Sequence, residues 1–359
     1  MFFKRLLCLI VSACMLLLSL TSCIAQTNSN ATVDPTPKAK KYYKFFNTES
    51  LIISYKGDSE EEFRSNHEAV AELLEEYHRL FDIYYEYSGL NNIKTINKNA
   101  GKAPVKVDDR LIDFLLYSKE IYSLTNGKTN IAMGSVLKLW HDCRKKATNP
   151  PYVETVPSEN ELKSASLHCD INNLIIDKEA GTVYISDPDM LLDVGATGKG
   201  YATERAAEML IERGVSSYVL NIGGNIRVIG EKVSGDGWVT GITNPDNSSD
   251  ESFIGRVIIS NSSLVTSGDY ERYYTVNGVK YHHIIDPVTL VPAKYFTSVS
   301  VLTKDSGLAD ALSTALFCMS YEDGLALINS IGGVEVIWVD LNYSIKTTPG
   351  VELLPNSDK

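Results

Sequence analysis

Short strand-like segments that follow one another closely are the feature that most constrains the fold of this chain. Segments rich in Val, Ile, Tyr and Thr, bounded by turn residues, occupy positions 173–177, 182–186, 190–194, 217–222, 226–230, 237–243, 256–260, 273–276, 279–285, 334–340 and 343–347. Between two of them, Asn277-Gly278 is typical of a two-residue β-hairpin turn. Strands grouped in this way predict an α+β fold with mixed antiparallel sheets and packed helices, because a parallel α/β fold would alternate strand and helix regularly.

Helices are predicted where apolar residues recur at intervals of three and four positions. The predicted helices cover 60–85, 108–127, 158–163, 202–213, 307–319 and a segment that starts near Tyr321. The first of them carries Tyr84 on its apolar face, and Ser158 with Glu161 fits a capping box at the start of another. No repeat or second linker interrupts these elements, so we expect a single folded domain over residues 42–359.

The N-terminus has the features of an export signal. Lys4 and Arg5 precede an apolar run that ends in Leu20-Thr21-Ser22-Cys23. This ending resembles the bacterial lipoprotein signal, in which the cysteine is lipidated after cleavage; an ordinary signal peptide with an incidental cysteine is the alternative. We therefore expect a signal peptide over 1–22, a lipidated Cys23 and a flexible tether over 23–41. The protein would then be extracytoplasmic and held on the bacterial membrane by its lipid alone.

Charge and cysteine content exclude several classes of function. The chain carries a formal net charge of −11 at pH 7, and an acidic surface repels the phosphate backbone of nucleic acids. Beyond the signal and Cys23, the remaining cysteines are Cys143, Cys169 and Cys318, an odd number without CxxC spacing. Neither a disulfide framework nor a thiolate metal cluster is expected from this pattern.

A glycine-rich turn at the start of a helix is the first candidate site. Residues 191–210 read LLDVGATGKGYATERAAEML, so Asp193 is followed by three glycines at the mouth of a predicted helix. Glycines allow close approach to a ligand, and the free amides of a helix N-terminus favour anions. The order GxxGxG matches neither the dinucleotide fingerprint nor the Walker A loop. The residues alone therefore predict an anion or nucleotide site, with a tight turn that merely packs as the open alternative.

Two further groups carry candidate chemistry. Asp310 and Thr314 are four residues apart, so a helix places both oxygens on one face, where they could hold a hard cation such as Mg²⁺. Taken alone, Asp310 is also explained as an acid in the first turn of a helix. In the hairpin, strand alternation places His283 and Ile285 on one face and His282 on the other. No zinc spacing accompanies these histidines.

Four motifs in this order resemble the ApbE family of FAD:protein FMN transferases. They are DVGATGKGYA (193–202), NIGGN (221–225), SGDYERYY with HHIIDPVT (267–274 and 282–289), and ADALSTALF (309–317), within a resemblance that extends from about Phe45 to Ile345. The resemblance implies Mg²⁺-dependent transfer of the FMN part of FAD to a Thr or Ser hydroxyl of an extracytoplasmic redox protein. A phosphoester forms and AMP leaves.

The resemblance also implies roles for individual residues. Asp193 and Lys199 would contact the flavin nucleotide, and the backbone of Ala196 with the side chains of Asp310 and Thr314 would hold the metal. The flavin-lining and phosphate-proximal residues would be Tyr87, Ile131, Ala132, Met133, His283, Ile284 and Ile285. His283 is the candidate base for the acceptor hydroxyl, for which a pKa near the working pH would be favourable.

Two positions depart from the family pattern, and two other functions remain open. Leu290 stands where the family commonly has glycine, and Asn225 where it often has aspartate. The alternatives are an FAD pyrophosphatase that produces FMN and AMP, and a flavin-binding lipoprotein without catalytic activity. The acceptor's identity, the oligomeric state and the number of metal ions are not encoded in recognisable patterns.

Overall fold

The computed structural model describes residues 36–55 and 57–356. The predicted signal peptide and Cys23 lie outside these residues. Within them, helices and strands are mixed and every strand pair is antiparallel, which confirms the predicted α+β class. No helix of the described part combines the length and apolar character needed to cross a membrane.

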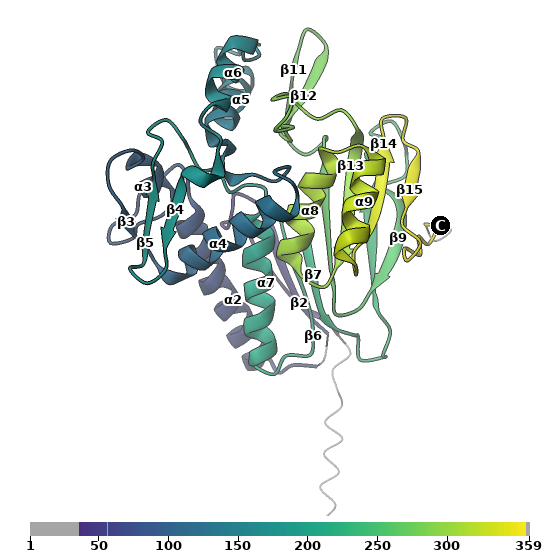
Figure 1. Cartoon of the computed structure of the whole chain (residues 1–359). Helices are drawn as coiled ribbons and strands as arrows, with labels where there is room; N and C mark the ends of the chain where they lie inside the picture. The colour runs from purple at the N-terminus through teal and green to yellow at the C-terminus, as the bar shows by residue number, and fades with distance from the viewer. Residues whose placement is uncertain (1–35, 56, 357–359) are drawn as a thin grey trace, which may run out of the picture. The chain divides into compact units, whose positions relative to one another are not determined.

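An eight-stranded sheet forms the centre of the fold, and its strands follow the order β1-β2-β6-β7-β10-β13-β14-β15 (Figure 1). The strands are β1 (Lys38–Tyr42), β2 (Ser50–Ser54), β6 (Ser217–Ile222), β7 (Asn225–Gly230), β10 (Ser263–Gly268), β13 (Phe296–Thr303), β14 (Glu335–Asp340) and β15 (Ile345–Thr347). Because β1 includes Lys38–Lys41, the ordered domain begins before the predicted boundary at Tyr42: these residues pair with β2 rather than extending the tether.

Three smaller sheets surround this centre. They are formed by β3 (Val105–Lys106), β5 (Thr182–Ile185) and β4 (Leu174–Asp177), by β8 (Trp238–Thr243) and β9 (Phe253–Ile259), and by the hairpin of β11 (Tyr273–Val276) and β12 (Val279–His282). The predicted hairpin turn is confirmed, since Asn277 and Gly278 both adopt positive φ angles, 49° and 80°.

Helices account for much of the rest of the described chain. They are α2 (Glu60–Phe81), α3 (Ile93–Lys98), α4 (Asp109–Leu124), α5 (Gly134–Thr148), α6 (Glu159–Ser166), α7 (Gly198–Glu212), α8 (Ser306–Phe317) and α9 (Tyr321–Ile331), with short 3₁₀ turns η1 (Ile131–Met133) and η2 (Ile171–Asn173). The predicted capping box of α6 is present, with reciprocal bonds between Ser158 and Glu161.

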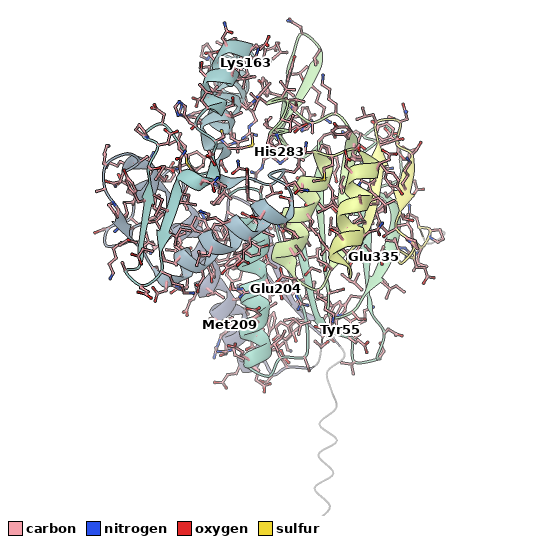
Figure 2. The ribbon with its side chains drawn as sticks, in the orientation of Figure 1. Tyr55, Lys163, Glu204, Met209, His283 and Glu335 are labelled. Carbon is pink, nitrogen blue, oxygen red and sulfur yellow. The ribbon has the colours of Figure 1, made fainter. Side chains whose placement is uncertain are left out.

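A buried ion pair fixes α7 and α8 relative to the sheet. Glu204 of α7 accepts hydrogen bonds from Arg227 of β7 at 3.2 and 3.0 Å, and from the amide of Ser306, at the start of α8, at 2.7 Å. Figure 1 shows α7 and α8 side by side, and Glu204 is labelled in Figure 2. One carboxylate thereby joins three elements and occupies the helix N-terminus, where a negative charge is favourable.

The first predicted helix is shorter than its apolar pattern indicates. It ends at Phe81, because the carboxylate of Asp82 accepts hydrogen bonds from the amides of Tyr84 and Tyr85 at 2.6 and 3.0 Å. These bonds form a local turn that competes with further helical bonds. The prediction that Tyr84 continues the helix is therefore wrong.

Residues 190–194 do not form the predicted strand. The amide and carbonyl of Leu192 bond to the side chain of Asn97 at 2.8 and 2.9 Å, and the amide of Asp193 bonds to the carbonyl of Ile131 at 2.8 Å. A side-chain amide thus satisfies backbone groups that a neighbouring strand would satisfy in a sheet. The segment runs into α7 as an irregular loop.

Candidate active site

The start of α7 and the first turns of α8 meet at a glycine. The amide of Gly200 donates a 2.8 Å hydrogen bond to Oδ2 of Asp310, and a Cβ placed on Gly200 would lie 2.3 Å from the Cβ of Asp310. Gly200 lies in the first turn of α7, where amides have no carbonyl partner within the helix, so the carboxylate of Asp310 serves as the acceptor. The carbonyl of Ala196, which precedes this turn, accepts no hydrogen bond among the described residues.

The groups predicted to hold a metal fit a hard cation. Asp310 is buried, and burial raises the pKa of its carboxyl above the usual aspartate range. Lys199 lies 3.6 Å from Oδ1 of Asp310, and Thr314 follows one turn later on the same helix, partly buried. A carboxylate, a hydroxyl and an unbonded carbonyl are oxygen ligands of the kind that Mg²⁺ prefers. The unpartnered carbonyl of Ala196 is the observation that favours such a site.

The predicted flavin-lining residues lie beside Asp193. Ile131, Ala132 and Met133 form the buried turn η1, and backbone hydrogen bonds join this turn and Gly134 to residues 191–193. The carboxylate of Asp193 accepts a bond from the amide of Gly195 at 3.0 Å, and its other oxygen lies 3.9 Å from Nδ1 of His141. The predicted lining and Asp193 are thus brought together by main-chain contacts.

His283 lies in a pocket between α5 and the β11–β12 hairpin, and Figure 2 labels it. Its amide donates to the carbonyl of Arg272 at 3.0 Å, and among the described residues its buried Nδ1 has no partner. Burial, and then the charges of Arg272, His282, Arg144 and Lys199, lower the pKa of His283 to about 3. The expected pKa near neutrality is therefore not found in the ligand-free protein.

The residues that flank His283 follow the predicted alternation. Ile284 packs in the apolar cluster beneath α8, together with Val299 and Leu312, whereas Ile285 packs with Trp140 of α5. Ile284 and Ile285 are both buried, so they anchor His283 between two clusters.

Four residues of this region were not identified by the sequence analysis, and they are His141, Arg144, Arg272 and Tyr84. His141 and Arg144, three positions apart on α5, line the pocket of His283. Burial, and then the positive charge of Arg272, lower the pKa of Arg144; burial lowers the pKa of His141 against the opposing effect of Asp193. The fourth residue is Tyr84. The spacing of His141 and Arg144 places them on one helix face, but nothing local indicates that this face meets the site.

Tyr84 and Tyr87, the predicted aromatic contact, differ in their surroundings. The hydroxyl of Tyr87 is bonded to Asp82 at 2.8 Å, and its ring lies under Arg79 at 5.3 Å. Tyr84 is 58% exposed; burial and then Asp193 raise the pKa of its hydroxyl, which Arg144 and Arg272 lower in turn. The charge of Asp193 thus acts on the hydroxyl of Tyr84, whereas the hydroxyl of Tyr87 is bonded to Asp82.

The two departures from the family pattern have clear local structures. Leu290 adopts φ = 64°, a conformation that favours glycine, and its carbonyl accepts a hydrogen bond from Nε1 of Trp140 at 2.9 Å. Asn225 is buried and donates to the carbonyl of Ile222 at 3.2 Å. Among the described residues, no hydrogen bond or ion pair joins either of them to Asp310.

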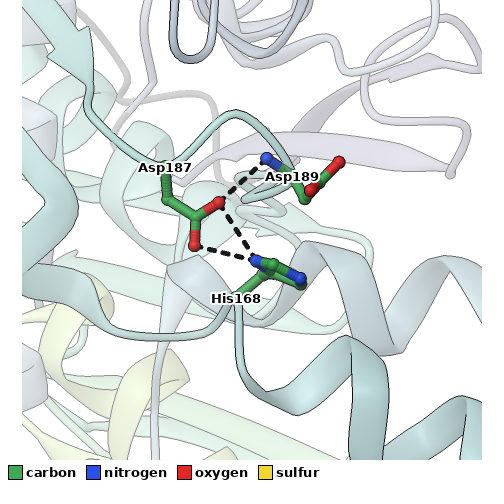
Figure 3. A group of neighbouring side chains, drawn as sticks. All are labelled: His168, Asp187 and Asp189. Atoms are coloured by element: carbon green, nitrogen blue, oxygen red, sulfur yellow. Dashed lines mark hydrogen bonds and ion pairs between the residues drawn. The ribbon is translucent and has the colours of Figure 1, made fainter.

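A second cluster of polar side chains contains none of these residues. Nδ1 of His168 lies 3.0 and 2.9 Å from the two carboxylate oxygens of Asp187, which also accepts from the amide of Asp189 at 2.9 Å (Figure 3). The ring of His168 and the carboxylate of Asp187 face each other in Figure 3, and this pairing connects two loops.

Comparisons with known proteins identify the family of this chain. The ApbE family model matches residues 46–338. The FAD:protein FMN transferase of Treponema pallidum is 33% identical over 276 residues, which are 72% of this chain and 73% of that protein. The FAD:protein FMN transferase of Haemophilus influenzae is 25% identical over 355 residues, 98% of each chain.

Solved structures share the fold. The ApbE protein of Thermotoga maritima has a TM-score of 0.76 at 28% identity, covering 88% of this chain and 97% of that one. A variant of the flavin transferase ApbE of Vibrio cholerae has a TM-score of 0.70 at 25% identity, covering 87% and 97%. Because the family model spans most of the chain, from residue 46 to residue 338, the protein described here belongs to the ApbE family.

Proposed function

We propose that this protein is a FAD:protein FMN transferase that joins FMN to a Thr or Ser hydroxyl of an acceptor protein and releases AMP. The names of the relatives support flavin transfer. The observation that carries the proposal is the Gly200–Asp310 hydrogen bond, which brings a carboxylate to the turn that holds Lys199 and the Ala196 carbonyl, a group with no partner among the described residues. A diphosphate on an acidic protein needs local positive charge, and a cation bound here would supply it.

In the proposed reaction, the acceptor oxygen attacks the phosphorus of the FMN half of FAD. A bond from this phosphorus to the acceptor oxygen forms, and its bond to the bridging oxygen breaks, so that AMP leaves with that oxygen. Asp310, Thr314 and the carbonyl of Ala196 would hold Mg²⁺, which supplies charge stabilisation for phosphoryl transfer when bound. Lys199 would pair with a phosphate, and Tyr84 and Asp193 would orient the flavin.

His283 would take the proton of the acceptor hydroxyl. Its imidazole is neutral above a pKa of about 3, so it can accept a proton at physiological pH. Nδ1 is buried without a partner among the described residues, which leaves an acceptor or donor atom aimed at the pocket. A bound diphosphate would offset the nearby cations that lower this pKa, and would strengthen the base.

The experiment is a mass measurement on full-length protein with FAD, Mg²⁺ and a candidate acceptor. Covalent FMN on the acceptor, with release of AMP, supports the transferase. Free FMN with AMP and an unmodified acceptor supports the pyrophosphatase instead. Intact FAD bound to the protein supports a binding function only. The Asp310→Asn variant should abolish product formation, and full activity of this variant would contradict the proposed cation site.

The acceptor is proposed to be an extracytoplasmic redox protein, reached by an enzyme anchored through lipid on Cys23. Export signals of this type direct proteins out of the cytoplasm. Labelling cells with a fatty-acid probe should mark the wild-type protein and not Cys23→Ser. Equal labelling of the two proteins would exclude the lipid anchor.

A further inference from the structure

Two arginines, Arg144 and Arg272, lie near His283, and the charges of both lower its pKa. Arg144 lines the same pocket as His283, and the backbone carbonyl of Arg272 accepts the His283 amide at 3.0 Å. Among the described residues, neither guanidinium forms an ion pair within 4.0 Å or a hydrogen bond. Arg110, Arg205 and Arg227, in contrast, each pair with a carboxylate.

The two positive charges repel each other, and an anion bound between them would relieve this repulsion. Arg144 is partly buried, and the neighbouring charge of Arg272 further lowers its pKa. Asp193 is the carboxylate that opposes them, and it also faces His141. Arginine offers five donors in a planar fork that suits phosphate oxygens. The pair therefore has the chemistry of a phosphate subsite.

The proposed reaction produces an anion that needs such a subsite. Each phosphate of FAD is a diester-like group with a single charge, and the modified acceptor keeps one such group. The departing AMP carries a phosphate monoester, whose charge is about −1.5 to −2 at pH 7. Negative charge therefore increases on the leaving fragment as the bond to the bridging oxygen breaks. Lys199, proposed above to pair with a phosphate, lies 3.6 Å from Asp310, so it shares its charge with that carboxylate and leaves part of this increase to other cations.

We propose that Arg144 and Arg272 form a subsite for the phosphate of the departing AMP and stabilise the charge that develops on it. This inference rests on the transferase function proposed above, and it assigns the arginines to the leaving group rather than to the flavin or the acceptor. Since the charge is greater in the transition state than in FAD, the pair contributes more to the rate than to FAD binding.

The direct test measures AMP binding by calorimetry on full-length protein with Mg²⁺ and without FAD. Arg144→Gln and Arg272→Gln should each weaken AMP binding about 10-fold to 100-fold, as expected for lost charged hydrogen bonds, and leave adenosine binding unchanged. Lys145→Gln removes the same charge from the adjacent, exposed position of α5 and should change neither. Unchanged AMP affinity in both arginine variants would overturn the proposal.

A second measurement separates the leaving-group role from acceptor recognition. Single-turnover transfer at saturating FAD should slow about 100-fold in Arg144→Gln, with partial recovery in Arg144→Lys and an unchanged acceptor KM. A higher acceptor KM with normal AMP affinity would assign the pair to the acceptor and overturn the proposal. If the wild-type protein failed to cleave FAD but still bound AMP in a way that depends on the two arginines, the transferase function would be refuted and the AMP subsite would stand. Because Arg272 is exposed, its variant tests the pair even where Arg144→Gln fails to fold.

Discussion

The amide of Gly200 and the carboxylate of Asp310 are joined by a 2.8 Å hydrogen bond between two helices. This bond gives an amide of the first turn of α7 its acceptor and orients the carboxylate of Asp310, a proposed metal ligand. The orientation of that ligand thus depends on a position that has no side chain.

Gly200→Ala should therefore disrupt both packing and cation binding. The added methyl would lie 2.3 Å from the Cβ of Asp310 and 2.4 Å from the carbonyl oxygen of Ser306, so α7 and α8 must separate. We expect a loss of about 1–3 kcal/mol in the free energy of unfolding and much weaker Mn²⁺ binding. Gly324→Ala is the control, since its methyl would meet the flexible end of Leu316. Normal metal affinity in Gly200→Ala would contradict this account of the site.

Asp310→Asn should be more stable than the wild type when no divalent cation is present. Burial raises the pKa of Asp310, so the folded state binds its proton more tightly than the unfolded state. Stability from this group is greatest below the unfolded pKa and decreases as pH rises toward the folded value. The melting temperature in EDTA at neutral pH should rise in the variant, and Mg²⁺ should raise it only in the wild type. A variant that melts lower in EDTA would show that the charge itself is favourable.

Removal of one partner of the buried Glu204–Arg227 pair should destabilise the fold. Both side chains are only 7% exposed, and Glu204 also accepts the amide of Ser306. Arg227→Met should lower the free energy of unfolding by about 3–5 kcal/mol in urea denaturation, because it leaves a buried carboxylate unpaired. Lys178→Met, which breaks an exposed pair with Asp113, should leave the denaturation midpoint unchanged. A similar midpoint for both variants would mean that the buried pair is dispensable.

His283→Ala should reduce transfer about 10²-fold to 10⁴-fold while FAD still binds. Because the pKa of His283 is about 3, its ring stays neutral from about pH 5 to pH 8, the range in which an unperturbed histidine titrates. NMR titration of the ligand-free protein should show no protonation of this ring in that range, and kcat/KM should lack an acid limb from it. Stability contributed by the neutral ring is lost as pH falls from 6.5 toward 3. A titration midpoint near 6.5 would overturn the burial argument.

Substitutions of Tyr84 and Tyr87 should have different effects on the affinity for FAD. Tyr84→Ala should weaken FAD binding about 3-fold to 10-fold, the range expected for one lost aromatic contact, as measured by quenching of flavin fluorescence. Tyr87→Phe loses its bond to Asp82 and should affect stability with little effect on FAD. The reverse result would restore Tyr87 as the flavin contact.

Local patterns predicted the parts of the site that lie on single elements. Asp310 and Thr314 share a face because a helix repeats every 3.6 residues, and the glycine turn before α7 follows from the permissive backbone of glycine. Arg144 and His141 were not predictable in this way. They reach the pocket because α5 packs on the hairpin, where the rings of Trp140 and Tyr281 stack with centroids 5.8 Å apart. Residues distant in sequence make this contact, and no local spacing encodes it.

The wrong predictions share a physical cause. At residues 190–194 the apolar pattern suited a strand, but Asn97 supplied the backbone partners. At Tyr84 the apolar pattern suited a helix, but Asp82 supplied a competing turn. In both places, hydrogen bonds from one polar side chain determined the backbone conformation. The apolar periodicity reflects only which residues are buried, so it could not predict these bonds.

The strand order of the main sheet has a consequence for unfolding. Since β1 and β15 are its outermost strands, the first and last strands of the chain fray at opposite rims. Opening from the β1 side must separate β1, β2 and β6, and opening from the β15 side must separate β15 and β14, before it reaches β7, β10 and β13, on which α7 and α8 pack. During limited proteolysis from the chain ends, the edge strands β1 and β15 should therefore be lost before the flavin-transfer activity is lost.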